Sequence, residues 1–269
     1  MRILFIGDIV GKLGRAATRR YIEDARAMSG NGTAPWDFII ANGENAAGGL
    51  GITPAIVDEM LGWGIDVVTG GNHTWRKREL LDYADRQPKL IRPANHPPGA
   101  PGFGHIVVES ATGMDLAVVS LQGRVYMDLF DCPFRTADHL LSDELPPDVP
   151  ILIDFHAEAT AEKIALRTYL DGRVAAIVGT HTHVPTADAM VTEKGTAYIT
   201  DVGMTGPIDS VIGMKTELAL HRFLTQMPAR YDAQDTGPSI VAGVQIEIDP
   251  TTRLATKITR IEERYPSLP

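Results

Sequence analysis

The chain has 269 residues, of which 44% are hydrophobic, and a formal net charge of -9 at pH 7. It is long enough to bury a sizeable core, and no Ser/Gly tract, repeat or charge block interrupts it, so residues 1–269 are predicted to form a single domain. The negative charge disfavours stable binding of long nucleic acids through phosphate contacts, although bound divalent cations would still allow a phosphate substrate.

Cysteine usage and hydropathy indicate the compartment. Cys132 is the only cysteine, which excludes an intrachain disulfide and a thiolate zinc site. The first apolar run stops at Asp8, too short for a signal-peptide core, and no segment reaches the length of a membrane span. We therefore expect a cytoplasmic protein without a membrane partner, and the sequence leaves homo-oligomerisation open.

The N-terminal half alternates short apolar runs with helical periodicity, a pattern typical of βαβ units. Thr53 and Pro54 have the residue types of a helix N-cap and first helical position. Two alternating runs joined across residues 111–113 predict an antiparallel hairpin. The predicted elements are strands at 3–7, 38–43 and 66–69, helices at 15–28, 54–61 and 77–85, a turn at 31–35, and hairpin strands at 105–109 and 116–120.

The C-terminal half begins with a loop at 122–135, which we interpret as the wall or lid of a pocket. Later strands alternate apolar and polar residues, so one of their faces is solvated or packed on helices, and the sheets are predicted to be mixed. The predicted elements are helices at 137–144, 160–170 and 216–224, and strands at 151–155, 174–178, 189–191, 196–200, 240–248 and 255–261.

Metal-competent side chains follow several of these predicted strands, where open α/β sheets place their ligand crevices. They are Asp8, Glu44, Asn72, His156, His181 and His183. Two histidines at a strand end are by themselves more often part of a solvated loop, but the repeated coincidence favours one shared site. Carboxylate, amide and imidazole donors without cysteine favour manganese, iron or zinc. Several ligands suggest two ions, an arrangement typical of phosphate ester hydrolysis.

The motifs, in chain order, are Gly7-Asp8, Gly43-Glu44-Asn45, Gly71-Asn72-His73, His156 and Gly179-Thr180-His181-Thr182-His183. This order resembles that of the calcineurin-like metallophosphoesterases, which usually show Asp-x-His, Gly-Asp-x-x-Asp, Gly-Asn-His-Asp/Glu, a lone His and Gly-His-x-His. The chain departs from that pattern at Val10, Glu44, Thr74 and Thr180. The same departures, together with Arg-Pro-Ala-Asn at 92–95 and Thr-Asp-Val-Gly-Met-Thr-Gly at 200–206, resemble the bacterial YmdB-like subfamily over nearly the whole chain.

The resemblance implies a four-layer α/β/β/α sandwich with mixed sheets and a binuclear phosphodiesterase that hydrolyses 2',3'-cyclic nucleotides to 3'-nucleotides. It implies two divalent or mixed-valence transition-metal ions, with iron or manganese favoured and zinc as an alternative. By this resemblance the ligands of one ion are Asp8, His183 and Asn45, those of the other are Asn72, His156 and His181, and Glu44 bridges them. A hydroxide bridging the two metals would attack phosphorus, and His73 would be the general acid.

Three further residues, Asn42, Arg124 and Asp201, are weaker candidates for substrate contacts, because a turn or capping role explains each of them equally well. The rival functions are a phosphodiesterase or phosphomonoesterase of broader specificity and a noncatalytic scaffold that keeps the fold. Degenerate sites lose ligands, whereas every polar motif position is matched here, which disfavours the scaffold.

Overall fold

Two mixed β-sheets form the centre of the structure, a computed structural model that describes residues 1–30, 32, 34–230 and 232–267. The first sheet has seven strands in the order β11 (Gly206–Pro207), β12 (Ser239–Ile248), β1 (Arg2–Ile6), β2 (Phe38–Asn42), β3 (Val67–Thr69) and β4 (Leu90–Ile91), with β13 (Ala255–Tyr265) paired to β12 outside this path. Strands β1 to β4 run parallel, whereas β12 is antiparallel to each of its neighbours.

The second sheet has six strands in the order β5 (His105–Glu109), β6 (Asp115–Gln122), β7 (Ile151–His156), β8 (Ala176–Thr180), β10 (Ala197–Ile199) and β9 (Met190–Val191). Strands β6, β7, β8 and β10 are parallel, and the two edge strands are antiparallel to their neighbours. The carboxyl ends of the parallel strands are the positions at which the sequence places its metal-competent residues.

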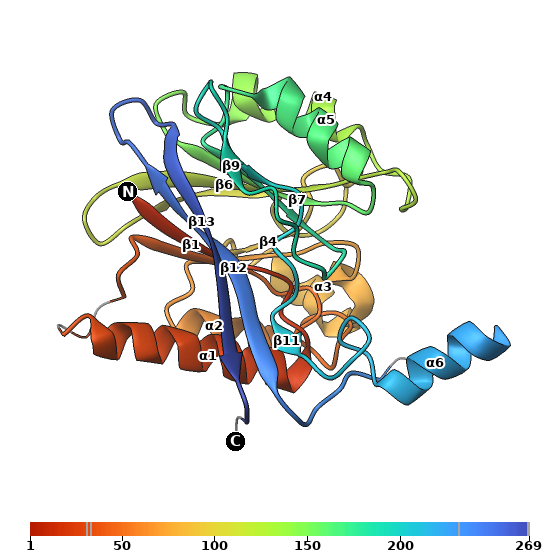
Figure 1. Ribbon diagram of the computed structural model, residues 1–269. Helices are drawn as coiled ribbons and strands as arrows, with labels where there is room; N and C mark the ends of the chain where they lie inside the picture. Colours follow the sequence, from red (N-terminus) through yellow and green to blue (C-terminus); the bar gives the residue numbers. More distant parts are fainter. Residues whose placement is uncertain (31, 33, 231, 268–269) are drawn as a thin grey trace.

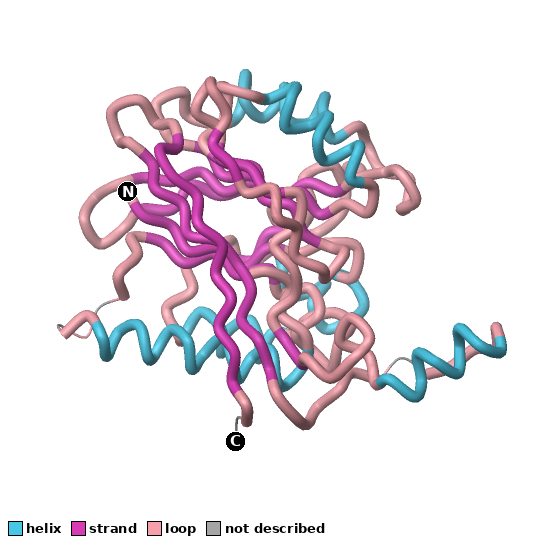
Figure 2. Tube along the Cα trace, in the orientation of Figure 1, coloured by secondary structure: helices cyan, strands magenta, loops and turns pink. Residues whose placement is uncertain are grey.

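Alternation along the strands explains how the sheets and helices pack. Ile3 and Phe5 of β1 share a buried cluster with residues of the second sheet, whereas Leu4 and Ile6 share another with α1 (Gly11–Met28) and α2 (Pro54–Gly62). A third cluster joins the second sheet to α4 (Pro133–His139) and α5 (Thr160–Leu170). Figures 1 and 2 show the strands between these two groups of helices. Because successive side chains point to opposite faces, a strand covered on both faces has a nearly continuous apolar sequence.

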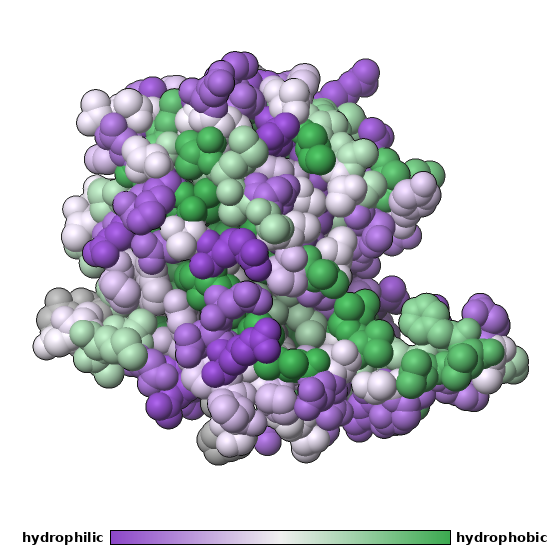
Figure 3. Space-filling view, viewed as in Figure 1, coloured by the Kyte–Doolittle hydropathy of each residue, from purple (hydrophilic) through white to green (hydrophobic). Residues whose placement is uncertain are grey.

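Five helical segments complete the fold among the described residues. They are η1 (Thr74–Arg76), η2 (Arg78–Leu80), α3 (Leu81–Ala84), the π-helical η3 (Leu140–Glu144) and α6 (Thr216–Thr225). Helix α6 projects from the body of the molecule (Figure 1), and apolar residues gather along it (Figure 3). Among the described residues, no helix combines the length and the apolar character that crossing a membrane requires.

The predicted α/β class with mixed sheets is confirmed, as are the hairpin and the helix at 160–170. The Thr53 hydroxyl accepts a hydrogen bond from the Ile56 N–H, as expected of an N-cap. Several boundaries differ from the prediction by one or more residues, and four differences are informative. Helix α1 begins at Gly11 and not at residue 15, because the Gly11 φ of +60° turns the chain directly into the helix. The polar segment predicted as one helix at 77–85 splits into η2 and α3, and α4 begins at Pro133 and not at residue 137. Strand β8 extends to Thr180 and not only to residue 178, because its last two residues still pair with β7. The turn predicted at 31–35 lies partly outside the described residues.

Candidate metal centre

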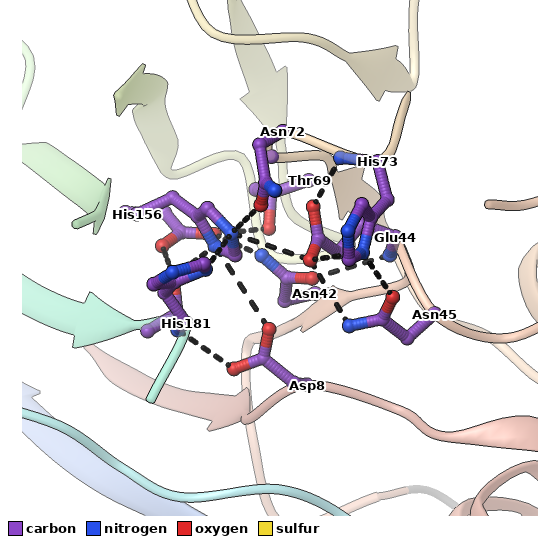
Figure 4. Close-up of polar contacts among 12 residues, drawn as sticks. Asp8, Asn42, Glu44, Asn45, Thr69, Asn72, His73, His156 and His181 are labelled. Atoms are coloured by element: carbon purple, nitrogen blue, oxygen red, sulfur yellow. Dashed lines mark hydrogen bonds and ion pairs between the residues drawn. The ribbon is translucent and has the colours of Figure 1, made fainter. Parts of the chain in front are cut away.

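The residues predicted as metal ligands and general acid meet at the carboxyl ends of strands from both sheets (Figure 4). They are Asp8 after β1, Glu44 and Asn45 after β2, Asn72 and His73 beyond β3, His156 at the end of β7, and His181 and His183 after β8. The structure brings all eight into one network of contacts, so residues up to 175 positions apart in the sequence share one small volume.

Glu44 lies in the middle of this network and is 1% exposed. Its Oε1 accepts a hydrogen bond from Asn45 Nδ2 at 3.0 Å and lies 3.2 Å from His156 Nε2. Its Oε2 accepts the backbone N–H of His73 at 2.9 Å. Burial opposes ionisation of this carboxyl, but the adjacent His156 and His73 hold the pKa of Glu44 well below its usual range. A buried carboxylate therefore connects the β2, β3 and β7 ends.

The ring of His156 is oriented by a chain of hydrogen bonds on its outer side. Its Nδ1 lies 2.9 Å from Thr180 Oγ1, and the Thr180 hydroxyl donates to Asp154 Oδ1 at 2.7 Å. Because the hydroxyl hydrogen is directed to Asp154, Nδ1 must donate to Thr180, which leaves Nε2 directed inward. This Nε2 lies 2.9 Å from Asn72 Oδ1 and 3.0 Å from His181 Nδ1.

The other two imidazoles are held in the same manner. His181 Nε2 lies 3.1 Å from Glu158 Oε2, so its Nδ1 is the inward nitrogen. His183 Nδ1 donates to the Ile212 carbonyl at 2.9 Å, and its Nε2 faces the Asn45 amide at 3.2 Å. His181 and His183 have φ values of 98° and 66°, a left-handed region that residues other than glycine rarely adopt. Such backbone persists only where the surroundings hold it, and here it directs both rings toward the network.

The donor atoms of this network fit a bound cation. One ligand atom from each of Glu44, His156 and His181 lies within 4.8 Å of the others. Asp8 is fully buried, and its Oδ1 has no hydrogen-bond partner among the described residues. Burial raises the pKa of Asp8. Although burial also disfavours a charged His156, the carboxylates of Glu44, Asp8 and Asp154 raise the pKa of His156 to about 9. The cluster therefore favours positive charge at its centre, and its oxygen and nitrogen donors suit a transition-metal ion.

Comparison with known proteins agrees with this geometry. A family model described as YmdB-like protein matches residues 4–261. The chain belongs to the YmdB-like family. A relative from Bacillus subtilis (strain 168), named 2',3'-cyclic-nucleotide 2'-phosphodiesterase, is 49% identical over 97% of this chain and 96% of its own length.

Two solved structures are also similar to this YmdB-like chain. A hypothetical protein from Thermus thermophilus gives a TM-score of 0.90 at 40% identity, covering 99% of this chain and 100% of that one. A protein described as a novel phosphatase from Mycoplasma pneumoniae gives a TM-score of 0.88 at 32% identity, covering 99% of this chain and 94% of that chain. The predicted family is thus confirmed, and the names of the relatives confirm the prediction of a phosphoric ester hydrolase at the level of enzyme class.

The YmdB-like chain supports His156 through a buried acid that the sequence interpretation did not identify. Asp154 is fully buried, and its Oδ2 accepts hydrogen bonds from Asn42 Nδ2 at 3.0 Å and Thr69 Oγ1 at 2.5 Å. Burial raises the pKa of Asp154 to about 6, although these partners and His156 oppose the rise. A carboxylate inside the apolar run at 151–155 was the signal that could have identified it.

A buried ion pair supports the segment that carries His181 and His183. Lys163 Nζ donates to Asp201 Oδ2 at 2.8 Å and to the Thr180 carbonyl at 2.7 Å. The same carboxylate oxygen accepts the Thr182 N–H at 3.1 Å. Lys163 was also missed, yet it occupies the inner stripe of α5 that Leu166 and Leu170 share, where a charge requires a partner.

The three weaker candidates lie at the edge of the centre or outside it. Asn42 is fully buried, and its Oδ1 accepts the Glu44 N–H at 3.2 Å. Asp201 is also fully buried, and its carboxylate accepts hydrogen bonds from Lys163 Nζ and the Thr182 N–H. The backbone N–H of Arg124 donates to the Glu162 carboxylate, and Arg124 also lines a separate groove beside the centre. Asn42 and Asp201 are therefore placed to position neighbouring ligands, and a substrate contact stays a prediction for all three.

Proposed function

We propose that this YmdB-like protein is a binuclear metal-dependent phosphodiesterase that hydrolyses 2',3'-cyclic nucleotides to 3'-nucleotides. The observation that carries the proposal is the orientation of three largely buried imidazoles, each bonded on its outer nitrogen. The inner nitrogen of His156 faces Glu44, that of His183 faces Asp8, and that of His181 faces His156. The name of the Bacillus subtilis relative, 49% identical to this chain, supports the substrate class.

We assign the ligands of the two ions from these contacts. Asp8, Asn45 and His183 would hold one ion, Asn45 through its amide oxygen, since His183 Nε2 lies 3.9 Å from Asp8 Oδ1 and 3.2 Å from Nδ2 of the Asn45 amide. The ligands of the other would be Asn72, His156 and His181, with Glu44 between the two groups. Iron or manganese suits these donors, and zinc is the alternative. When bound, such ions supply a nucleophile from water at neutral pH and stabilise charge on the phosphoryl oxygens.

His73 is placed to supply the proton for the leaving oxygen. Its backbone N–H is held by Glu44, and its Nδ1 lies 2.8 Å from Asn45 Oδ1. The side chain is 23% exposed, and within the described part of the chain its Nε2 has no protein partner. Water would add to phosphorus as the bond to the 2' oxygen breaks, and Nε2 would protonate that oxygen, leaving a 3'-phosphate.

The arrangement also supports two further parts of the proposal. The helices on the outer sides of two stacked sheets fit a four-layer α/β/β/α sandwich in which the whole chain acts as one catalytic domain.

A phosphatase of broader specificity is the second candidate function, because the related structure from Mycoplasma pneumoniae is described as a phosphatase. A noncatalytic scaffold has less support, since it would not need His73 to be held by two separate contacts.

The test is hydrolysis of a panel of 2',3'-cyclic, 3',5'-cyclic and linear phosphoesters by protein loaded with each metal in turn. We expect 2',3'-cyclic nucleotides to be preferred and the product to be the 3'-phosphate. The substitution His73→Ala should retain both metals and reduce kcat by about 100-fold or more, because only the proton donor is lost. The exposed His221→Ala on α6 is the control and should match the unmodified protein. Loss of metal in His73→Ala, or a 2'-phosphate product, would show that the assignment is wrong.

A further inference from the structure

A second groove lies beside the metal centre, between β5, α4 and the segment that follows β4. Its volume is about 790 Å³, and its lining includes Arg92, His96, Arg124, Phe130 and Arg135. A groove of this size can hold more than the ring of a cyclic phosphate, and none of the eight residues of the metal centre lines it.

The groove and the metal centre are built on the same strand ends. The Gly123 N–H donates to the His156 carbonyl at 3.0 Å, and Arg124 is the next residue. Asn95 is bonded twice to the backbone of Gln122, which lies opposite His156 in the strand register. The groove and the metal centre therefore lie at the carboxyl ends of neighbouring strands of the second sheet.

The charge in this groove is unlike that of the chain as a whole, which has a net charge of -9. Among the described residues, no carboxylate pairs with the guanidinium of Arg124 or Arg135. Arg92 donates only to backbone carbonyls, at Pro93, Ala100 and Pro101. Of the two acids in the lining, Glu144 lies within ion-pair distance of His105 and His139, which leaves Asp131 as the other negative group. Guanidinium groups without carboxylate partners are suited to phosphate.

The inner end of the groove also offers an aromatic face and polar atoms without partners. The rings of His96 and Phe130 lie 4.2 Å apart at 31°, and the edge of Trp75, two residues after His73, meets His96 at 6.3 Å. Arg124 Nε and His96 Nε2 are buried and have no hydrogen-bond partner in the part of the chain that the structure describes. A polar, planar ligand such as a nucleobase would use these groups.

We propose that this groove binds the nucleotide that precedes the scissile group, so that the preferred substrate is a short oligoribonucleotide with a terminal 2',3'-cyclic phosphate. The linking phosphate is bound by Arg124 and Arg135, and a base packs against the His96 and Phe130 rings. The inference rests on the proposed function for its cleavage step, in which water adds to phosphorus, the bond to the 2' oxygen breaks and that oxygen takes a proton. The net charge of -9 disfavours binding of long nucleic acids, so a short oligonucleotide is the expected substrate.

The experiment compares adenosine 2',3'-cyclic phosphate with the adenylyl dinucleotide that ends in the same group, using metal-loaded protein. We expect kcat/KM to be about 10-fold higher for the dinucleotide, the effect of one added phosphate contact and one stacked base. Affinity is measured separately by calorimetry with the two products, 3'-AMP and the dinucleotide 3'-phosphate. The dinucleotide should bind more tightly, and the slope of its log affinity against log salt should be steeper by about 0.7, as expected for one additional phosphate contact.

Arg135→Ala is the informative variant because this side chain is exposed on α4 and makes no ion pair with any residue that the structure describes. It should remove most of the dinucleotide preference and leave the mononucleotide unchanged, whereas Arg19→Ala, an exposed arginine on α1, should change neither. Equal rates and equal affinities for the two ligand lengths would overturn the groove assignment while leaving the proposed function intact. Failure to hydrolyse either substrate would contradict the proposed function, and the calorimetric comparison would then decide the groove assignment by itself.

Discussion

The hydrogen-bond chain from Asp154 through Thr180 to His156 provides a direct test of how the metal centre is built. In Thr180→Val the side chain keeps its shape, but Asp154 loses a donor at 2.7 Å and His156 Nδ1 loses its acceptor at 2.9 Å. Loss of the bond to a buried carboxylate should lower the free energy of unfolding by about 2 kcal/mol. If His156 is a metal ligand as proposed, removing the group that orients its imidazole should weaken metal binding by about 10- to 100-fold.

Thr196→Val is the matched control for this substitution. Thr196 is also fully buried in the second sheet, donates to the Val174 carbonyl at 2.9 Å and accepts the Gly172 N–H at 2.8 Å, but it does not contact the centre. It should lose about 1 to 2 kcal/mol of stability and keep its metal affinity. Urea denaturation and competition with a fluorescent chelator measure the two quantities. Equal metal affinity in Thr180→Val and Thr196→Val would refute the orienting role.

Three other substitutions test separate parts of the structure. Gly71→Ala should abolish metal binding, measured by metal content, because an added Cβ would collide with the side chains that meet at the centre; Gly62→Ala, where a Cβ has open space, should retain the metal. Burial, with a smaller contribution from a nearby arginine, lowers the pKa of His96 from 6.5 to about 4, so its neutral form contributes stability above pH 6.5 that is lost as pH falls toward 4. After allowance for its partial exposure, that loss should be about 1 kcal/mol between pH 7 and pH 5 and absent in His96→Phe. The measurement is the free energy of unfolding in urea as a function of pH, and the same pH dependence in the unmodified protein and in His96→Phe would contradict this role. Lys163→Met should cost about 3 kcal/mol or more by leaving the Asp201 carboxylate buried without its cation, and a loss under about 1 kcal/mol would mean that the ion pair is dispensable.

That the candidate ligands would meet at one edge of the sheets could be predicted from the sequence, because strand ends mark them. Asp8, Glu44 and His156 each follow an apolar run, and parallel strands deliver their carboxyl ends to one edge. The boundary of β8 was predicted two residues early, because Gly179 and Thr180 are small or polar and their pairing with β7 is a property of the assembled sheet.

The orientation of the candidate ligands could not be predicted, because it depends on partners far away in the chain. The acceptor for His183 Nδ1 is the Ile212 carbonyl, 29 residues later, and Asp154 meets Thr69 across 85 residues. Periodicity reports which face of an element is buried, but it carries no information about which polar groups meet there. The same limit explains why Lys163 and Asp154 were missed although each interrupts an apolar pattern.

The central claim is that strand ends from two sheets hold a pair of metal ions, and anomalous diffraction from crystals of the metal-loaded protein tests it most directly. We predict two anomalous peaks, one bounded by Asp8, Asn45 and His183 and the other by Asn72, His156 and His181, with Glu44 between them. A single peak, or metal bound elsewhere in a protein that is still active, would contradict the account.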